Sequence, residues 1–236
     1  MTIEKTIDGL TLQGFTPPLK LADFKLIAFD MDSTLINIEC IDEIADTVGL
    51  KAEVAAITEA TMRGEITDFK TSLRRRVALL KGVSLQDMER VYTKRLQLNP
   101  GAVELIGACK KAGMKVLLVS GGFTFFASRV AATLGIDYAK SNELEVANER
   151  LTGGLVNQSW GDICDGEEKR KTLLQTCTLL GIKPSHSIAV GDGANDLPMM
   201  AAAGLSVAYC AKPKVREQAM VAINEGGLDR LLEVLI

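Results

Sequence analysis

The stretch Leu26-Ile27-Ala28-Phe29-Asp30-Met31-Asp32-Ser33-Thr34-Leu35 decides the fold class. Its apolar start is typical of a buried strand. Two carboxylates follow, and charges that leave an apolar run must be solvated, paired or bound to a metal ion. Residues i and i+2 of an extended segment point to the same side, so Asp30 and Asp32 are suited to one site, one as nucleophile or metal ligand and the other as acid or base. The alternative interpretation is a plain strand-to-helix turn, with Asp32 or Ser33 as the N-cap.

Two other segments repeat the pattern of an apolar strand followed by polar residues. The run Ile188-Ala189-Val190 leads into Gly191-Asp192-Gly193-Ala194-Asn195-Asp196, and the run Val116-Leu117-Leu118-Val119 leads into Ser120-Gly121-Gly122. In an open α/β sheet the carboxyl ends of the strands gather in one crevice. The three polar strand ends therefore predict a single site at that edge.

The order of the expected elements predicts an α/β fold, with a Rossmann-like, mostly parallel sheet, helices on both faces and an inserted helical-bundle cap. Helical periodicity alone runs from Cys40 to about Lys94, with helices expected near 52–62 and 69–80 and a capping box at Ser84 and Asp87. After Asn99-Pro100-Gly101, strands and helices alternate again, and 143–156 is predicted to form a hairpin. We expect a core of residues 1–38 and 98–236 and a cap of residues 39–97. Residues 1–23 are predicted to be an irregular lead-in.

Composition excludes several classes of partner. The chain has 236 residues, 47% of them hydrophobic, and a net charge of -3, so nothing electrostatic favours nucleic acid or an anionic membrane. No apolar run approaches the roughly 20 residues of a membrane helix, and the amino terminus does not resemble a secretory signal. The five cysteines are scattered without a Cys-x-x-Cys pair, which indicates reduced thiols in a cytoplasmic protein rather than a zinc site or disulfides. The single histidine, His186, lies in a turn and makes a Ser-His-Asp mechanism improbable.

The motifs together resemble those of the haloacid dehalogenase superfamily of aspartate-nucleophile phosphatases. The resemblance rests on Asp-x-Asp-x-Thr at 30–34, the strand-end Ser120, a downstream lysine and Gly-Asp-Gly-x-Asn-Asp at 191–196. It covers roughly residues 24 to 236. Within the superfamily, Asp-Met-Asp-Ser-Thr-Leu-Ile-Asn-Ile-Glu at 30–39, Ser-Leu-Arg-Arg-Arg-Val at 72–77 and Val-Ser-Gly-Gly-Phe at 119–123 are most similar to the phosphoserine phosphatases.

The resemblance implies an aspartyl-phosphate mechanism that depends on Mg²⁺. Asp30 is expected to be the nucleophile and Asp32 the acid and base. Mg²⁺ is expected on the carboxylates of Asp30 and Asp192 and the backbone carbonyl of Asp32, since hard oxygen ligands suit this ion. Ser120 and the backbone around Gly121 and Gly122 are expected to hold phosphoryl oxygens.

A fixed positive charge and a supporting carboxylate are expected beside the metal site. Lys169 matches the lysine of the family, and Arg170 and Lys171 are its alternatives. Asp196 is expected to orient water or Lys169, with a simple role at the start of a helix as the alternative.

The same resemblance implies phosphoserine as a small-molecule substrate, hydrolysed to serine and phosphate in the last step of serine biosynthesis. Glu39 is expected to pair with the ammonium of the substrate and Arg76 with its carboxylate. Asn195 matches a substrate-contacting amide. Met62 and Phe69 match apolar positions that line the substrate, although packing within the bundle explains them equally well. The protein is expected to be a monomer or a homodimer.

Two alternative functions stay open at this point. Another small phosphomonoester, or phosphoryl transfer to an acceptor alcohol, requires the same core. A phospho-accepting receiver-like regulatory domain also combines an aspartate, a hydroxyl and a lysine on an α/β sheet. Receiver domains lack an acid two residues after the nucleophile and an inserted cap, so Asp32 and the segment 40–94 favour turnover.

Overall fold

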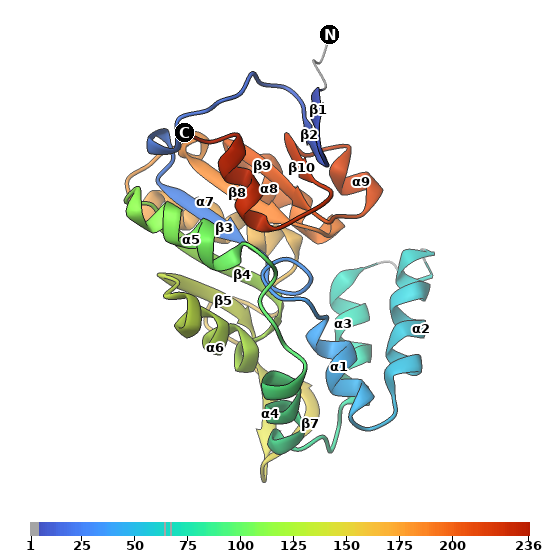
Figure 1. The fold of residues 1–236 in the computed structure, drawn as a ribbon. Coiled ribbons are helices and arrows are strands. Elements are labelled where there is room, and N and C mark those ends of the chain that lie inside the picture. Colours follow the sequence, from blue (N-terminus) through green and yellow to red (C-terminus); the bar gives the residue numbers. More distant parts are fainter. Residues whose placement is uncertain (1–4, 64, 67) are drawn as a thin grey trace.

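The computed structural model describes residues 5–63, 65–66 and 68–236, without the side chains of residues 5–7 and 62. Their centre is a sheet of eight strands (Figure 1). In spatial order the strands are β1 (Lys5–Ile7), β2 (Leu10–Leu12), β10 (Val221–Ile223), β9 (Leu205–Tyr209), β8 (Ser187–Gly191), β3 (Leu26–Phe29), β4 (Lys115–Phe123) and β5 (Tyr138–Asn142). The six strands from β10 to β5 are parallel, and β1 and β2 pair antiparallel at one edge. The prediction of a mostly parallel sheet is confirmed.

Helices cover both faces of this sheet. Alternate residues of β3 belong to different apolar clusters: Ile27 and Phe29 pack on the side of α5 and α6, and Leu26 and Ala28 on the side of α7 and α8. This two-sided burial explains why the strand is apolar at every position. The helices of this part of the chain are α5 (Ala102–Lys111), α6 (Thr124–Leu134), α7 (Gly166–Leu179), α8 (Leu197–Ala202) and α9 (Pro213–Arg216).

β3 lies between β4 and β8, the strands that carry the other two polar ends. The chain leaves β3 toward β4 on one side and reaches β8 on the other, so β3 stands at a topological switch point. Loops on the two sides of such a point turn away from each other and leave a crevice at the carboxyl ends of the strands. The fold therefore places the three motifs beside one another.

Four helices form a separate bundle beside the crevice (Figure 1). They are α1 (Cys40–Asp46), α2 (Lys51–Met62), α3 (Phe69–Leu79) and α4 (Leu85–Lys94). The side chain of Asp68 caps α3 by accepting a bond from the Thr71 amide, and the predicted capping box of Ser84 and Asp87 is present at α4. The hairpin of β6 (Leu144–Ala147) and β7 (Arg150–Leu155) is also confirmed, and β7 lies against α3. The domain boundaries at 38/39 and 97/98 stay a prediction.

The sequence prediction was wrong at the edges of the sheet. Residues 5–12 form the hairpin of β1 and β2 and not an irregular lead-in, because Leu10 and Leu12 are buried where β2 pairs with β10 at the far end of the chain. β5 and β10 were not predicted, and β4 continues through Gly121 and Gly122 to Phe123. The sequence pattern also predicts a helix over 227–235, where the structure has the 3-10 helix Leu228–Glu233. The other 3-10 helices of the described residues are Leu21–Asp23, Pro184–His186 and Ala194–Asp196.

Within the described part of the chain, no helix combines the length and apolar character that a membrane crossing requires.

Candidate active site

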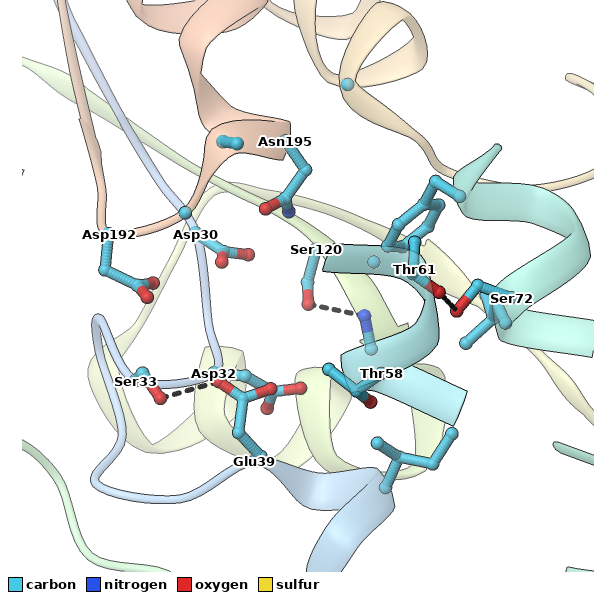
Figure 2. A pocket seen from close by; sticks show the side chains of 18 of the residues that line it. Asp30, Asp32, Ser33, Glu39, Thr58, Thr61, Ser72, Ser120, Asp192 and Asn195 are labelled. Atoms are coloured by element: carbon cyan, nitrogen blue, oxygen red, sulfur yellow. Dashed lines mark hydrogen bonds between the residues drawn. The ribbon is translucent and has the colours of Figure 1, made fainter. Parts of the chain in front are cut away.

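The carboxylates of the first motif leave β3 in a tight turn. The amide of Asp30 still donates to the carbonyl of Val190 on β8, at 3.0 Å, so the sheet fixes its backbone. The amides of Thr34, Leu35 and Ile36 then all point to the carbonyl of Met31, which closes the turn. Asp30 is buried and Asp32 partly buried. Both face one cavity, as expected for residues i and i+2 of an extended segment (Figure 2).

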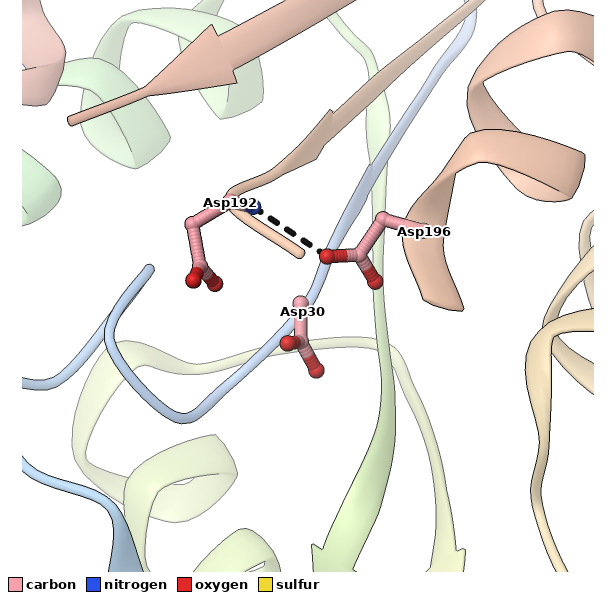
Figure 3. A group of neighbouring side chains, drawn as sticks. All are labelled: Asp30, Asp192 and Asp196. Atoms are coloured by element: carbon pink, nitrogen blue, oxygen red, sulfur yellow. Dashed lines mark hydrogen bonds between the residues drawn. The ribbon is translucent and has the colours of Figure 1, made fainter. Parts of the chain in front are cut away.

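The loop after β8 is organised by Asp196. Its Oδ2 accepts the amides of Asp192 (3.1 Å) and Gly193 (2.9 Å) and so fixes the backbone that carries the Asp192 carboxylate. Oδ1 lies 2.6 Å from Nζ of Lys169. Both oxygens of Asp196 are thus engaged by protein groups, whereas the Asp192 carboxylate points toward Asp30 (Figure 3). Asp196 positions the loop and the lysine and is not needed as a metal ligand.

Lys169 lies on the first turns of α7 and is fully buried. Its Nζ is 2.6 Å from Oδ1 of Asp30 and 2.6 Å from Oδ1 of Asp196. Burial lowers the pKa of this ammonium, but the carboxylates of Asp196 and Asp30 outweigh burial and raise the pKa above its usual value. Its neighbours in sequence lie elsewhere: Arg170 pairs with Glu167, and Lys171 is exposed.

The acidic cluster carries more negative than positive charge. One oxygen each of Asp30, Asp192 and Asp196 lies within 4.8 Å of the others, and Lys169 is the cation paired with them among the described residues. Burial raises the pKa of Asp30 well above its usual range, with Asp196 and Asp192 adding to the effect and Lys169 opposing it. Burial and Asp196 likewise raise the pKa of Asp192 to about 7. An all-oxygen group of this kind fits a divalent cation, which would neutralise the excess charge.

Ser120 and the two following glycines line the floor of the cavity. Oγ of Ser120, fully buried, accepts the amide of Gly122 at 2.8 Å. A Cβ atom at Gly122 would lie 2.8 Å from Oδ2 of Asp32, and one at Gly121 would lie 3.0 Å from the ring of Phe69. Bare backbone is therefore required at both positions, and it allows a ligand to approach the chain closely.

The cavity has a volume of about 1200 Å³ and lies between the strand ends and the bundle. Of the residues predicted for the site, it is lined by Asp30, Asp32, Glu39, Phe69, Arg76, Ser120, Gly121, Asp192 and Asn195. Lys169 lies behind this surface and reaches it through Asp30. The side chain of Met62 falls outside the described part of the structure.

Arg76 and Glu39 mark the bundle side of this cavity. Nε of Arg76 is buried and has no hydrogen-bond partner among the described residues. Burial lowers the pKa of this guanidinium, with Asp42 and Glu39 opposing. Glu39 accepts a bond from the hydroxyl of Ser33 at 2.6 Å. Arg76 is thus a desolvated donor that faces an open cavity, which is an arrangement suited to an anionic ligand group.

Asp32 differs from Asp30 in its surroundings. Burial raises the pKa of Asp32 to about 8, and the nearby Glu39 contributes in the same direction. Its Oδ1 is buried and has no hydrogen-bond partner among the described residues. Burial thus favours the protonated form of this carboxyl group, which faces the cavity.

Several residues of the site were not assigned a role from the sequence. The hydroxyl of Thr34 donates to Oδ1 of Asp192 at 3.0 Å, and Nδ2 of Asn142 donates to the carbonyl of Gly121 at 2.7 Å. Thr61 and Ser72 lie across the cavity on α2 and α3 and are joined by a 2.7 Å bond (Figure 2). Thr34 is the threonine of the Asp-x-Asp-x-Thr motif, so the sequence could have indicated that it belongs to the site. The others meet the site only through tertiary packing.

The chain is similar to several known proteins. The family model of the haloacid dehalogenase-like hydrolases matches residues 27–201. A phosphoserine phosphatase of Polaromonas sp. is 72% identical over 227 residues, which cover 96% of each chain. A phosphoserine phosphatase of Haemophilus influenzae is 48% identical and aligned over 94% of this chain and 68% of its own length.

A solved structure of a phospho-aspartyl intermediate analogue of phosphoserine phosphatase superposes with a TM-score of 0.82 at 40% identity, covering 90% of this chain and 99% of its own. The family model spans well over half of the chain, and the fold is that of the solved relative. The chain therefore belongs to the haloacid dehalogenase-like hydrolase family.

Proposed function

We propose that the protein hydrolyses O-phospho-L-serine to L-serine and phosphate through an aspartyl-phosphate intermediate. The observation that carries this proposal is one cavity with Asp30 and Asp32 on one wall and the guanidinium of Arg76 on the other, whose Nε has no hydrogen-bond partner among the described residues. The relatives of highest identity described above are phosphoserine phosphatases, and their alignment covers nearly the whole chain.

Asp30 is the nucleophile in this proposal. Its carboxylate attacks phosphorus, an acyl-phosphate bond forms, and the ester bond to the serine oxygen breaks. Lys169, 2.6 Å from Oδ1, opposes the effect of burial on the pKa of this carboxyl group, favours its ionised form and orients it. The Ser120 hydroxyl and the amides near Gly121 donate hydrogen bonds to the oxygens of the transferred phosphoryl group.

Asp32 moves the protons. Its carboxyl donates a proton to the leaving serine oxygen and then removes one from the water that attacks the acyl phosphate. That water releases phosphate and restores the Asp30 carboxylate. The position of Asp32 two residues beyond the nucleophile, with a free buried oxygen, supports both steps.

Asp30, Asp192 and the backbone carbonyl of Asp32 would hold Mg²⁺. The bound ion would supply positive charge beside the phosphate and allow the dianion to approach a carboxylate. Thr34 and Asp196 keep the Asp192 side chain and its loop in place.

Arg76 and Glu39 select the amino-acid part of the substrate. Arg76 binds the carboxylate, Glu39 the ammonium, and Asn195 lies on the same cavity wall as Asp192. Phe69 supplies an apolar contact from the bundle side. Residues 39–97 act as the cap that closes over the core, which receiver-like regulatory domains do not have. We place this reaction in the cytoplasm, at the last step of serine biosynthesis, since the five cysteines are free thiols.

The test is turnover of phosphoserine with Mg²⁺, measured against phosphoethanolamine, an aryl phosphate and a sugar phosphate. We expect the highest kcat/KM for phosphoserine. Acid quench during turnover with ³²P-labelled substrate is expected to leave label on Asp30, and Asp30→Asn is expected to leave none. A higher kcat/KM for a phosphomonoester without an amino-acid group would contradict the proposal that phosphoserine is the substrate. Label on Ser33, Thr34 or Ser120 contradicts the mechanism.

A further inference from the structure

Helix α3 presents two different faces. Phe69, Ser72, Leu73 and Arg76 recur at helical spacing and line the cavity. Lys70, Arg74 and Ala78 follow one another at intervals of four on the adjoining face, which is turned toward the segment 153–165 of the core. The three consecutive arginines 74–76 therefore have three different surroundings: Arg74 meets the core, Arg75 is exposed, and Arg76 lines the cavity.

Two ion pairs connect this second face to the core. Nη2 of Arg74 lies 2.5 Å from Oδ2 of Asp162, and Nζ of Lys70 lies 3.6 Å from Oδ2 of Asp165. One turn further on, the carbonyl of Ala78 lies so close to Gly153 that a Cβ there would be 3.1 Å away. The core segment thus runs along α3 in the opposite direction, with partners 165, 162 and 153 for positions 70, 74 and 78.

The two ends of α3 are attached in different ways. Just beyond its C-terminal end, backbone bonds join Gly82 and Val83 to Leu151 at 2.8 Å each, and Arg150 donates to the carbonyl of Gly82 at 2.7 Å. In the first half of the helix, the polar contacts to the core among the described residues are the pairs of Lys70 and Arg74. These side chains are 38% and 52% exposed, so the contacts are easily broken and reformed.

The Lys70 contact ends on a residue that also shapes the catalytic side. Asp165 is the N-cap of α7, where its Oδ1 accepts the amide of Glu168 at 2.9 Å, and its carbonyl accepts the amide of Lys169 at 2.9 Å. Asp165 is therefore in contact with both elements: it caps the helix that carries Lys169, and it pairs with Lys70 of α3.

We infer that Arg74–Asp162 and Lys70–Asp165 form an electrostatic latch that holds the first half of α3 against the core when substrate is bound. Lys70 and Arg74 are positioning residues: they touch no substrate, but they place Phe69 and Arg76 over the phosphate site. The bonds near Gly82 keep the other end attached while the latch opens and closes. This inference rests on the proposed function, because the latch acts on a substrate held between core and bundle.

The expected effect on catalysis is moderate and has a defined form. Exposed pairs of this kind shift an equilibrium by about two- to fivefold, and apparent affinity falls in proportion to the closed fraction. Loss of the latch therefore raises KM, while kcat changes by less than about twofold, since opening is not slowed. Ionic strength screens exposed pairs, so added salt is expected to raise the KM of the parent protein as well.

The experiment is a charge swap between Arg74 and Asp162 with Arg75 as the matched control. R74E and D162R are each expected to raise KM for phosphoserine about fivefold or more, and R74E/D162R to return it to within about twofold of the parent. R75E changes the net charge by the same amount on the same helix and is expected to leave KM within about twofold. Raising NaCl to about 0.5 M is expected to raise KM of the parent more than that of R74E, because salt screens the latch in the parent in addition to the substrate contacts that both proteins share.

Three outcomes overturn the latch: R74E that behaves like R75E, a double variant no better than the single ones, or R74E that still responds to salt as the parent does. Circular dichroism and urea unfolding of each variant identify any loss of fold. A parent protein that fails to hydrolyse phosphoserine overturns the proposed function instead. In that case hydrogen exchange of the amides at 70–75 is the readout for the charge swap. R74E is expected to speed this exchange and R75E is not. The double variant R74E/D162R is expected to return the exchange rate to that of the parent.

Discussion

The ammonium of Lys169 lies 2.6 Å from Oδ1 of Asp30, although the lysine side chain is fully buried. A buried ammonium is stable only when carboxylates surround it, and here Asp196 is the second partner. The ammonium opposes the rise in the pKa of Asp30 that burial causes, and so favours the ionised form that attacks phosphorus. Lys169 pairs with Asp30 and Asp196, and the described residues supply no ion pair to Asp192.

Removal of divalent metal is expected to stop hydrolysis. EDTA should abolish turnover, Mg²⁺ should restore it, and Ca²⁺ should not, because Ca²⁺ prefers more ligands and longer bonds than a small octahedral site offers. Titration calorimetry provides a second readout, in which Asp192→Asn weakens Mg²⁺ binding and Asp229→Asn, outside the cavity, does not. Full activity in metal-free buffer would argue against the cation site.

Asp32→Asn is expected to slow both formation and hydrolysis of the phosphoenzyme by about 10²–10⁴-fold with phosphoserine, since the leaving oxygen then lacks a proton donor. The loss in the formation step should shrink with an aryl phosphate, whose leaving group needs little protonation. Rapid-quench kinetics with the two substrates measures this difference. Equal losses in that step with both substrates would show that Asp32 does not act as the acid.

Arg76→Ala is expected to raise KM for phosphoserine about ten- to a hundredfold, the loss of one charge-assisted bond. Phosphoethanolamine lacks the carboxylate, so its KM should change far less. Glu39→Ala should weaken both substrates, because both carry the ammonium. Arg75→Ala, on the same helix but exposed, is the control and should change neither. An effect of Arg75→Ala similar to that of Arg76→Ala would indicate general damage to the bundle.

Asp196→Asn is expected to destabilise the protein by about 3 kcal/mol, because it removes one charge from a buried pair and leaves the ammonium of Lys169 with Asp30 alone. If the side-chain carbonyl turns toward Lys169, the amide nitrogen replaces Oδ2, and the backbone amides of Asp192 and Gly193 both lose their acceptor. Urea unfolding measures the change. Asp229→Asn serves as the reference, and a value near zero would mean that Asp196 is dispensable for the loop.

Asp87 is expected to give helix α4 a pH-dependent stability. The pKa of Asp87 is held below its usual range, chiefly by the hydrogen bond from the Ser84 hydroxyl. The Ser84 amide and Arg90 act in the same direction. A carboxyl whose pKa is lower in the folded than in the unfolded state stabilises fully above the unfolded value, about 3.9, and loses this contribution as pH falls through the folded value.

The matching measurement is urea unfolding of the parent and Asp87→Ala between pH 7 and pH 3. The parent should be more stable by about 1 kcal/mol at neutral pH, and the difference should shrink toward pH 3. Gln86→Ala, exposed on the same helix, should show a difference that does not depend on pH. If the difference in unfolding free energy between the parent and Asp87→Ala stays constant over this pH range, ionisation of Asp87 does not contribute to the stability of α4.

The fold class was readable from the sequence because its signals are local. An apolar run that ends in carboxylates, as at Phe29-Asp30, and glycines that bracket Asp192 reflect requirements of single strands and turns. The capping box at Ser84 and the hairpin at 144–155 are local in the same sense. In contrast, β2 and β10 have three residues each, and they pair with each other only where the two ends of the chain meet, so their strand character was missed.

The sequence by itself determined that three polar strand ends meet at one edge of a parallel sheet, because strand direction and side-chain alternation follow from short-range sterics. Only the tertiary structure decided how equivalent residues divide their tasks. Of the three adjacent cations at 169–171, only Lys169 is buried against Asp30. Of the three arginines at 74–76, the rotation of α3 places Arg74 at Asp162, Arg75 in solvent and Arg76 at the cavity. Such choices depend on which groups surround a side chain after packing, and residues far apart in the chain supply those groups.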